Sequence, residues 1–227
     1  CAMVSGVKKG NVRVCFTVNK EHLNQIAEYI EEYKKPIEKK LSVSLDVHLS
    51  VQHPSTQTVI VKDDNSFFRD KDNKITFTYA GHGALLENLN AIDAEIVFIK
   101  NIDNVSQNHI ADIVKYKKLI GGILFHLQQL IFGYLNDLER EDVTDEKIRV
   151  IKEFAQMELH LVLPNDFERY EKASQIEYLF EELNRPIRVC GMVRNEGEPG
   201  GGPFWVKNEE GTVSLQIVET SQIDLAN

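Results

Sequence analysis

The sequence predicts an α/β fold with a mixed, mainly parallel sheet and a helical insertion. Residues 12–17 (VRVCFT) are a short β-branched apolar run typical of a buried strand. Residues 22–40 carry apolar side chains at intervals of three and four, the spacing of an amphipathic helix. Residues 41–52 alternate apolar and polar side chains, the period of a half-exposed strand. Strand and helix therefore alternate along the chain, as in α/β proteins.

The next elements follow the same pattern. Two β-rich runs, residues 58–62 and 75–79, are separated by the polar, turn-forming residues 63–74, which predicts a hairpin or a meander. A short helix is expected over residues 84–89, and the apolar run IVFI at residues 96–99 is expected to be a strand.

The middle of the chain predicts a helical insertion over about residues 107–183. Helical spacing extends over residues 107–138, where the pair Gly121 and Gly122 either breaks the element or lets another backbone pack closely. Thr144 and Asp166 are expected to cap two further helices at their amino ends.

Strand-like sequence returns near the end of the chain, at residues 188–193, 204–207 and 212–218. We therefore expect a single α/β domain over residues 1–227, with its sheet drawn from about residues 1–105 and 186–220. The chain opens on Cys1 and strand-like sequence runs almost to the last residue, which suggests a fragment of a longer protein.

Composition narrows the classes of partner. The 227 residues carry 35 acidic and 26 basic side chains, a formal charge of -9. Such a surface repels polyanions, which argues against nucleic acid or an anionic membrane as partner. A small anion held by backbone N–H groups is compatible with this net charge. No run approaches the roughly 20 apolar residues of a membrane helix. We expect a soluble, cytoplasmic protein.

The cysteines and histidines give little sign of a metal site. Three cysteines without metal-type spacing indicate free thiols in a reducing compartment. Cys15 is expected to be a small buried apolar side chain, and Cys190 would need a neighbouring base to act as a nucleophile. His48 and His53 are expected to be surface or packing residues rather than metal ligands.

Gly81, His82 and Gly83 lie between a predicted strand and a predicted helix. Two glycines let the backbone approach a ligand closely, and the start of a helix offers N–H groups to an anion or a nucleobase. The segment suits a nucleotide. The alternative is a strand-to-helix turn with an incidental histidine.

Asn101, Asp103 and Asn104 follow the predicted strand at residues 96–99. Ligands of open α/β sheets bind beyond the carboxyl ends of the strands, so Asp103 is placed to hold Mg²⁺ together with substrate phosphate oxygens. The alternative is that Asp103 and Asn104 cap the long helix that follows.

Residues 190–205 (CGMVRNEGEPGGGPFW) form a candidate ligand loop rich in glycine. Its glycines permit a close backbone approach, Arg194 suits a phosphate, and a glutamate such as Glu196 suits sugar hydroxyls. The glycines that follow are Gly200, Gly201 and Gly202. The alternative is a flexible connection between strands.

Three stretches, GHGALLENLNAIDAEIVFIKNIDN, RVCGMVRNEGEPGGGPFWV and SLQIVETSQID, carry a family resemblance. With the opening strand and helix included, the chain resembles the bacterial domain-of-unknown-function family four-three-zero-one over essentially its whole length. That family supplies no reaction to carry over.

More distantly, the order glycine-histidine-glycine, helix, apolar strand and Asn-x-Asp-Asn is similar to sugar-1-phosphate uridylyltransferases and other nucleotide-diphospho-sugar transferases. This resemblance implies a three-layer sandwich, with residues 81–83 near the nucleotide and Asp103 near Mg²⁺ and the diphosphate. Arg194 and residues 196–202 would then meet the sugar phosphate.

The glycine-rich, basic loop with which those enzymes grip the triphosphate is absent from this sequence. The leading expectation is nucleotidyl transfer onto a sugar 1-phosphate in the intact protein. The alternatives are a non-catalytic nucleotide or sugar-phosphate sensor, and a scaffold whose glycine loop only joins strands.

Overall fold

The computed structural model describes residues 10–101, 108–194, 196–197, 200–209, 212–219 and 222–223. Helices and strands are mixed along the chain, which confirms the α/β character expected from the sequence. The chain divides into two compact units, Cys1–Lys118 and Leu119–Asn227, and each is described by itself below.

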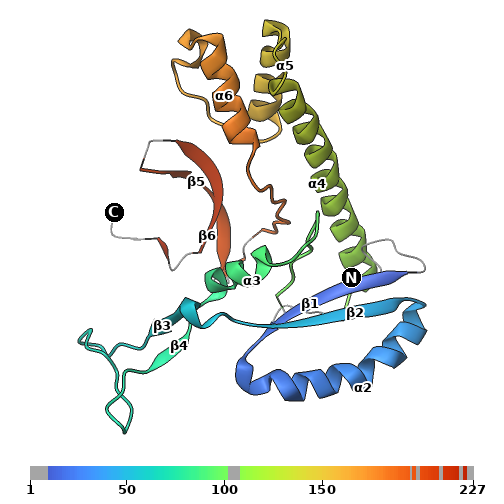
Figure 1. Ribbon diagram of the computed structural model, residues 1–227, viewed down its shortest axis with the longest axis vertical. Helices are drawn as coiled ribbons and strands as arrows, with labels where there is room; N and C mark the ends of the chain where they lie inside the picture. Colours follow the sequence, from blue (N-terminus) through green and yellow to red (C-terminus); the bar gives the residue numbers. More distant parts are fainter. Residues whose placement is uncertain are drawn as a thin grey trace. The chain divides into compact units, whose positions relative to one another are not determined.

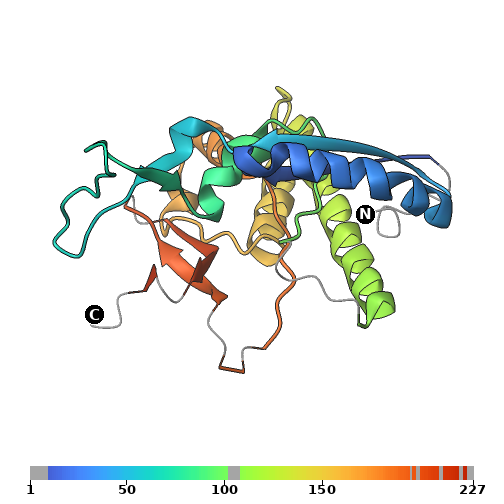
Figure 2. The same ribbon diagram turned by 90° about the horizontal axis from the view of Figure 1, so that it is seen from below.

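The first unit opens with a strand–helix–strand motif whose two strands are parallel. β1 (Asn11–Val18) pairs with β2 (Ser44–Val51), and α2 (Leu23–Leu41) connects them after the short 3-10 helix η1 (Lys20–His22). Figures 1 and 2 show α2 running along one face of the strand pair. This motif confirms the first three predicted elements.

Local chemistry explains where α2 ends. Pro36 lies inside the helix without ending it, and the helix stops at Ser42, which adopts a left-handed conformation with φ of 55°. The backbone N–H of Ser42 donates to the carbonyl of Glu38, and the Glu38 carboxylate accepts from the N–H of Leu45 at 2.7 Å. The predicted strand over residues 41–52 therefore begins at Ser44, because the last turn of the helix occupies Leu41.

The strand pair has a small apolar core on one face. Val12 and Val43 are buried there, and Val14, Leu41 and Leu45 pack against them. Successive strand residues point to opposite faces, so the residues between these valines and leucines lie on the other face.

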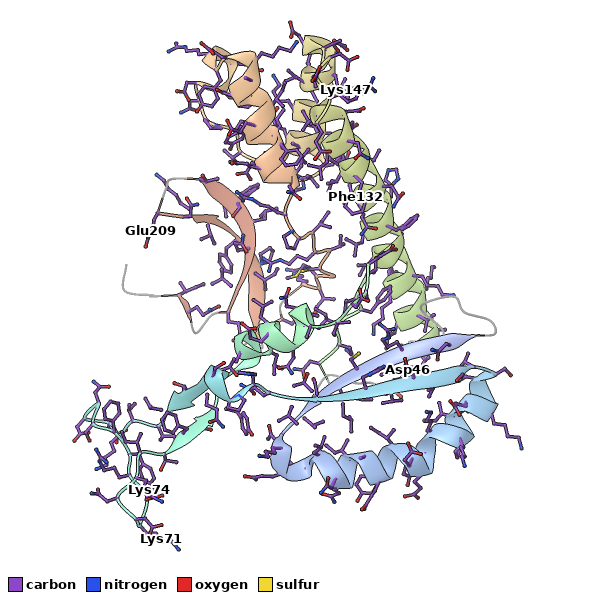
Figure 3. The ribbon with its side chains drawn as sticks, in the orientation of Figure 1. Asp46, Lys71, Lys74, Phe132, Lys147 and Glu209 are labelled. Atoms are coloured by element: carbon purple, nitrogen blue, oxygen red, sulfur yellow. The ribbon has the colours of Figure 1, made fainter. Side chains whose placement is uncertain are left out.

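A β-arm follows, made of η2 (Pro54–Thr56), β3 (Gln57–Val59) and β4 (Phe77–Tyr79), the last two antiparallel. The residues between them fold into two tight turns. Each turn ends on an asparagine in the left-handed region, Asn65 and Asn73, which this residue tolerates well. The predicted hairpin or meander is confirmed, and Lys71 and Lys74 mark its second turn in Figure 3.

The first unit continues with η3 (His82–Leu85) and α3 (Leu86–Asn90), which confirm the short predicted helix. The strand predicted at residues 96–99 is not formed, so this expectation was wrong. Its composition suits a strand, but no described segment pairs with its backbone, and Phe98 and Ile99 remain exposed.

The second unit has a helical core. It consists of most of α4 (Ile110–Leu138), α5 (Asp145–Met157), η5 (Phe167–Arg169) and α6 (Lys172–Leu183). Their buried apolar side chains form one cluster: Ile131, Leu138, Val143, Ile148, Ile151, Phe154, Ala155, Phe167, Leu179 and Leu183.

The ends of these helices test the predicted caps. The hydroxyl of Thr144 accepts from the N–H of Lys147 at 3.2 Å and caps α5 as expected. Asp166 makes no side-chain cap bond and precedes only η5, so the helix expected from residue 166 begins at Lys172 instead. Gly121 and Gly122 lie inside α4 and do not interrupt it.

α4 corrects the expectation that no segment has the length and apolar character of a membrane helix. It has 29 residues and contains an 18-residue window of mean hydropathy 1.2. By length and composition alone it could cross a membrane, but core helices of soluble proteins meet the same two criteria. Its carboxyl half contributes Ile131 and Leu138 to the buried cluster, while only 6% of the apolar window is buried within the described structure.

The last paired element is an antiparallel hairpin of β5 (Gly201–Lys207) and β6 (Val213–Glu219). Residues 188–193 are not a strand, contrary to prediction. The described strands thus form three separate two-stranded sheets, β1–β2, β3–β4 and β5–β6. The mixed α/β class is confirmed, while the three-layer sandwich stays a prediction.

Candidate functional site

The carboxyl ends of β1 and β2 meet at one edge of the first unit, because the strands are parallel and Val18 pairs with Val51. Asn19 and η1 follow β1 at this edge, and Gln52, His53 and η2 follow β2. In α/β proteins, ligands bind beyond the carboxyl ends of parallel strands. This edge is therefore the candidate site of the first unit.

The loop after β2 is held by its own side chains. His53 Nδ1 lies 2.6 Å from the hydroxyl of Ser55 and accepts from the Ser55 N–H, while the Thr56 hydroxyl donates to the His53 carbonyl at 2.7 Å. The side-chain amide of Gln52 donates to Thr56 at 3.0 Å, and Gln52 is only 5% exposed. These bonds fix polar groups at the end of β2.

One hydrogen bond ties α3 to the same edge. The side-chain amide nitrogen of Asn88 donates to the carbonyl of Val51, the last residue of β2, at 3.0 Å. The other amide atom, Asn88 Oδ1, is buried without a hydrogen-bond partner. A buried polar atom without a partner costs about 1–3 kcal/mol, so it calls for an explanation. Sequence reasoning missed Asn88, whose only signal was a polar residue inside a predicted helix.

Asn88 also connects the glycine-histidine-glycine segment to this edge, since α3 follows η3 without a break. Gly81 is extended, with φ of −65° and ψ of −171°, and a Cβ added at Gly81 or Gly83 would meet no atom within 4 Å. The space beside both glycines is open. The side chain of His82 lies outside the described part of the structure.

The predicted metal ligand is not placed. Asn101 is described and has an interaction partner, but Asp103 and Asn104 fall in residues 102–107, outside the described residues. Within the described residues, no group of three or more His, Cys, Asp or Glu side chains is arranged to hold a metal ion.

The predicted sugar-phosphate residues belong to the second unit, whereas Gly81 and Gly83 belong to the first. Arg194 and Glu196 are exposed in the segment before β5, and Gly201 and Gly202 lie inside β5. A Cβ at Gly201 would lie 3.1 Å from the Cγ2 atom of Ile217 on the paired strand, so the glycine suits a close approach within the hairpin.

The second unit also carries a hollow of about 370 Å³ between α4 and α6. Its lining is Phe132, Leu135, Asn136, Glu139, Phe180 and Asn184. Phe132 is labelled in Figure 3. The lining contains none of the residues that sequence reasoning selected.

The face of the β1–β2 pair opposite the apolar core carries a row of polar side chains. Asp46 Oδ1 lies 3.0 Å from His48 Nε2, and Asp46 Oδ2 lies 3.7 Å from Arg13 Nε. The hydrogen bond with His48 is the largest effect on the pKa of Asp46 and lowers it. Desolvation, the next largest effect, raises the pKa, and the charges of His48, Arg13 and Lys34 each lower it by less. Asp46 is labelled in Figure 3.

Cys15 belongs to the same row and corrects a prediction. It was expected to be buried, but it is a free, exposed thiol, because Arg13, Cys15 and Thr17 all point to the polar face while Val12 and Val14 take the apolar one. His48 is a surface residue, as expected.

Comparison with known proteins assigns the chain to a family. No curated protein and no solved structure matches the sequence. One family model matches residues 2–227, almost the whole chain, and its description is Domain of unknown function (DUF4301). The chain therefore belongs to the DUF4301 family.

Proposed function

We propose that the first unit binds a nucleotide or a sugar nucleotide at the edge where β1 and β2 end. The observation that carries the proposal is Asn88, which joins α3 to the end of β2 and keeps a buried amide oxygen without a partner. A nucleobase presents N–H donors to such an oxygen once the ligand opens the edge.

The residues around this edge offer complementary chemistry for the rest of a nucleotide. Lys20 is the first residue of η1, one residue beyond the end of β1, and the N-cap residue Asn19 makes no side-chain bond to the N–H groups of that turn. Cations and free N–H groups at the start of a helical segment suit a phosphate. Gly81 and Gly83 leave open space for a base or a ribose.

Calorimetric titration of the 227-residue chain with UTP, UDP-glucose and glucose 1-phosphate, each with and without Mg²⁺, tests the proposal. We expect UTP or UDP-glucose to bind and to raise the melting temperature, because a ligand selective for the folded state stabilises it. The absence of heat and of a thermal shift with all three compounds would overturn the proposal.

Two pairs of variants locate the site. Asn88→Ala and Lys20→Ala should each weaken UTP binding by about tenfold, the equivalent of a single lost hydrogen bond or ionic contact of about 1.4 kcal/mol. The matched controls are Asn90→Ala, which alters an exposed residue of the same helix, and Lys74→Ala on the β-arm. Equal affinity in all four variants would place the ligand elsewhere.

A more specific version of the proposal is that the bound nucleotide undergoes nucleotidyl transfer. Asp103 and the segment of residues 194–202 would supply the Mg²⁺ and sugar-phosphate contacts. Incubation of UTP, glucose 1-phosphate and Mg²⁺ with the intact protein should then release pyrophosphate, and Asp103→Asn should abolish the release. Binding without release supports a sensor rather than an enzyme.

A further inference from the structure

The polar face of the β1–β2 pair brings a thiol, an imidazole and a carboxylate to neighbouring positions. β1 and β2 are in parallel register, which pairs Arg13 with Asp46, Cys15 with His48 and Thr17 with Ser50. These three pairs follow one another along the strands and share one face.

Contacts on both sides of Cys15 confirm that the paired side chains face each other. Before it, Arg13 lies 3.7 Å from Asp46, and after it the hydroxyls of Thr17 and Ser50 lie 3.0 Å apart. Cys15 and His48 occupy the position between these two contacts. Paired residues project from the same face of the strands, so the thiol and the imidazole occupy neighbouring positions, with no hydrogen bond between them in the described structure.

The imidazole of His48 is oriented by Asp46, which lies two residues earlier on the same strand. Nε2 of His48 lies 3.0 Å from the Asp46 carboxylate. Among the described residues no hydrogen bond joins Nδ1 to another group, so this nitrogen is available. A carboxylate bonded to one ring nitrogen holds the neutral tautomer in which the other nitrogen accepts a proton. Nucleophile, base and orienting carboxylate are the three parts of an activated thiol.

We propose that Cys15 is a reactive thiol that forms mixed disulfides with small, carboxylate-bearing disulfides, with His48 as the base. The Sγ–H proton passes to His48 Nδ1, and the sulfur attacks one sulfur of the disulfide. The disulfide bond of the small molecule breaks, its second half leaves as a thiolate, and that thiolate takes the proton from the imidazolium. Cys15 is oxidised and the small molecule is reduced, so the exchange balances.

Charge explains the preference for a carboxylate-bearing partner. Arg13 lies two residues before Cys15 on the same face, and its side chain is half exposed. The charged groups facing this row are Arg13, Asp46 and His48 from the strands, with Lys34 of α2 acting on Asp46 through its charge. Nη1 of Arg13 also donates to the carbonyl of Asp93 at 2.8 Å, so the backbone at Asp93 lies beside this face. The guanidinium N–H groups of Arg13 that are not bonded to Asp93 can receive a carboxylate of the incoming disulfide while the thiol attacks the sulfur.

Exchange kinetics test the proposal on the full chain. The variant Cys1→Ser with Cys190→Ser keeps only Cys15, and Cys1→Ser with Cys15→Ser keeps Cys190, a second exposed thiol outside the strand pair, as the matched control. We expect Cys15 to react with glutathione disulfide about tenfold faster than Cys190 at about pH 7. Equal rates would overturn the proposal.

The role of His48 is tested in the background that keeps only Cys15. His48→Ala should slow the exchange about tenfold at about pH 7, and it should change the shape of the rate–pH profile, because the imidazole no longer takes the proton of the thiol. Asp46→Asn should slow it less. Circular dichroism shows that each variant keeps its fold, and an unchanged profile in folded His48→Ala would overturn the role of His48.

The role of Arg13 is tested by comparing two disulfide reagents of opposite charge. Arg13→Ala should slow exchange with glutathione disulfide, which bears carboxylates, about threefold to tenfold. It should leave exchange with cystamine, which is cationic, unchanged or faster. Equal slowing with both reagents would mean that Arg13 only supports the strands, and it would overturn the preference for anionic disulfides.

Discussion

The two units differ in what holds them together. Among the described residues, the helices of the second unit bury ten apolar side chains in one cluster, whereas the β1–β2 motif buries Val12 and Val43 alone. The polar row and the candidate ligand edge lie in the unit with the smaller core. Regions with few buried apolar groups open more readily. We therefore expect the helical unit to be the more stable one and the strand motif to carry the binding and reactive groups.

The helical core should give the largest single effect. Leu179 is fully buried in α6, and Leu179→Ala should lower the free energy of unfolding by about 2–5 kcal/mol, because it removes buried methyl groups and leaves a cavity. Urea denaturation followed by circular dichroism measures the loss. The control Leu119→Ala alters a leucine of α4 that is 57% exposed and should cost much less. Equal losses would contradict the assignment of the core.

A smaller and local effect is expected in the strand motif. Val12→Ala removes two buried methyl groups, each worth about 0.8 kcal/mol, so the motif should lose about 1.5 kcal/mol. Hydrogen exchange should become faster in β1 and β2 and stay unchanged in α5 and α6. Val193→Ala, at a valine that is 90% exposed, is the control. Equally faster exchange in both units would show that they unfold together.

The cap of α5 should contribute about 1 kcal/mol. Thr144→Ala removes the hydroxyl that accepts from the Lys147 N–H and leaves that donor without its partner. Thr144→Ser keeps a hydroxyl and should retain most of the stability. Thermal denaturation of both variants measures the difference, and identical melting temperatures would mean that the cap bond contributes nothing.

The smallest expected effect is a loss of stability at acidic pH. The pKa of Asp46 is lowered in the folded chain, chiefly by its hydrogen bond with His48. Its stabilising contribution is therefore complete above the unfolded pKa of about 3.9 and is lost as the pH falls through the lower folded pKa. The stability difference between the native chain and Asp46→Asn should shrink from about pH 6 to about pH 3. A constant difference in urea midpoint would contradict this linkage.

Local patterns predicted most single elements. Three-and-four spacing identified α2 and alternation identified β2, because their apolar side chains face one neighbour and their polar side chains face solvent. A β-branched apolar run identified β1, and the cap residue Thr144 identified α5, since a cap bond joins residues three apart. Residues 96–99 and 188–193 failed because a strand also needs a partner, and composition does not reveal whether one is present.

The sequence alone determined the α/β class, the family membership and the glycine-histidine-glycine segment as a feature to examine. The tertiary structure decided which chemical groups meet. The link from Asn88 to the end of β2 spans 37 residues, and the placement of Cys15 beside His48 depends on strand register. Strand register and long-range hydrogen bonds arise only when distant segments pack together, so a local sequence pattern does not predict them.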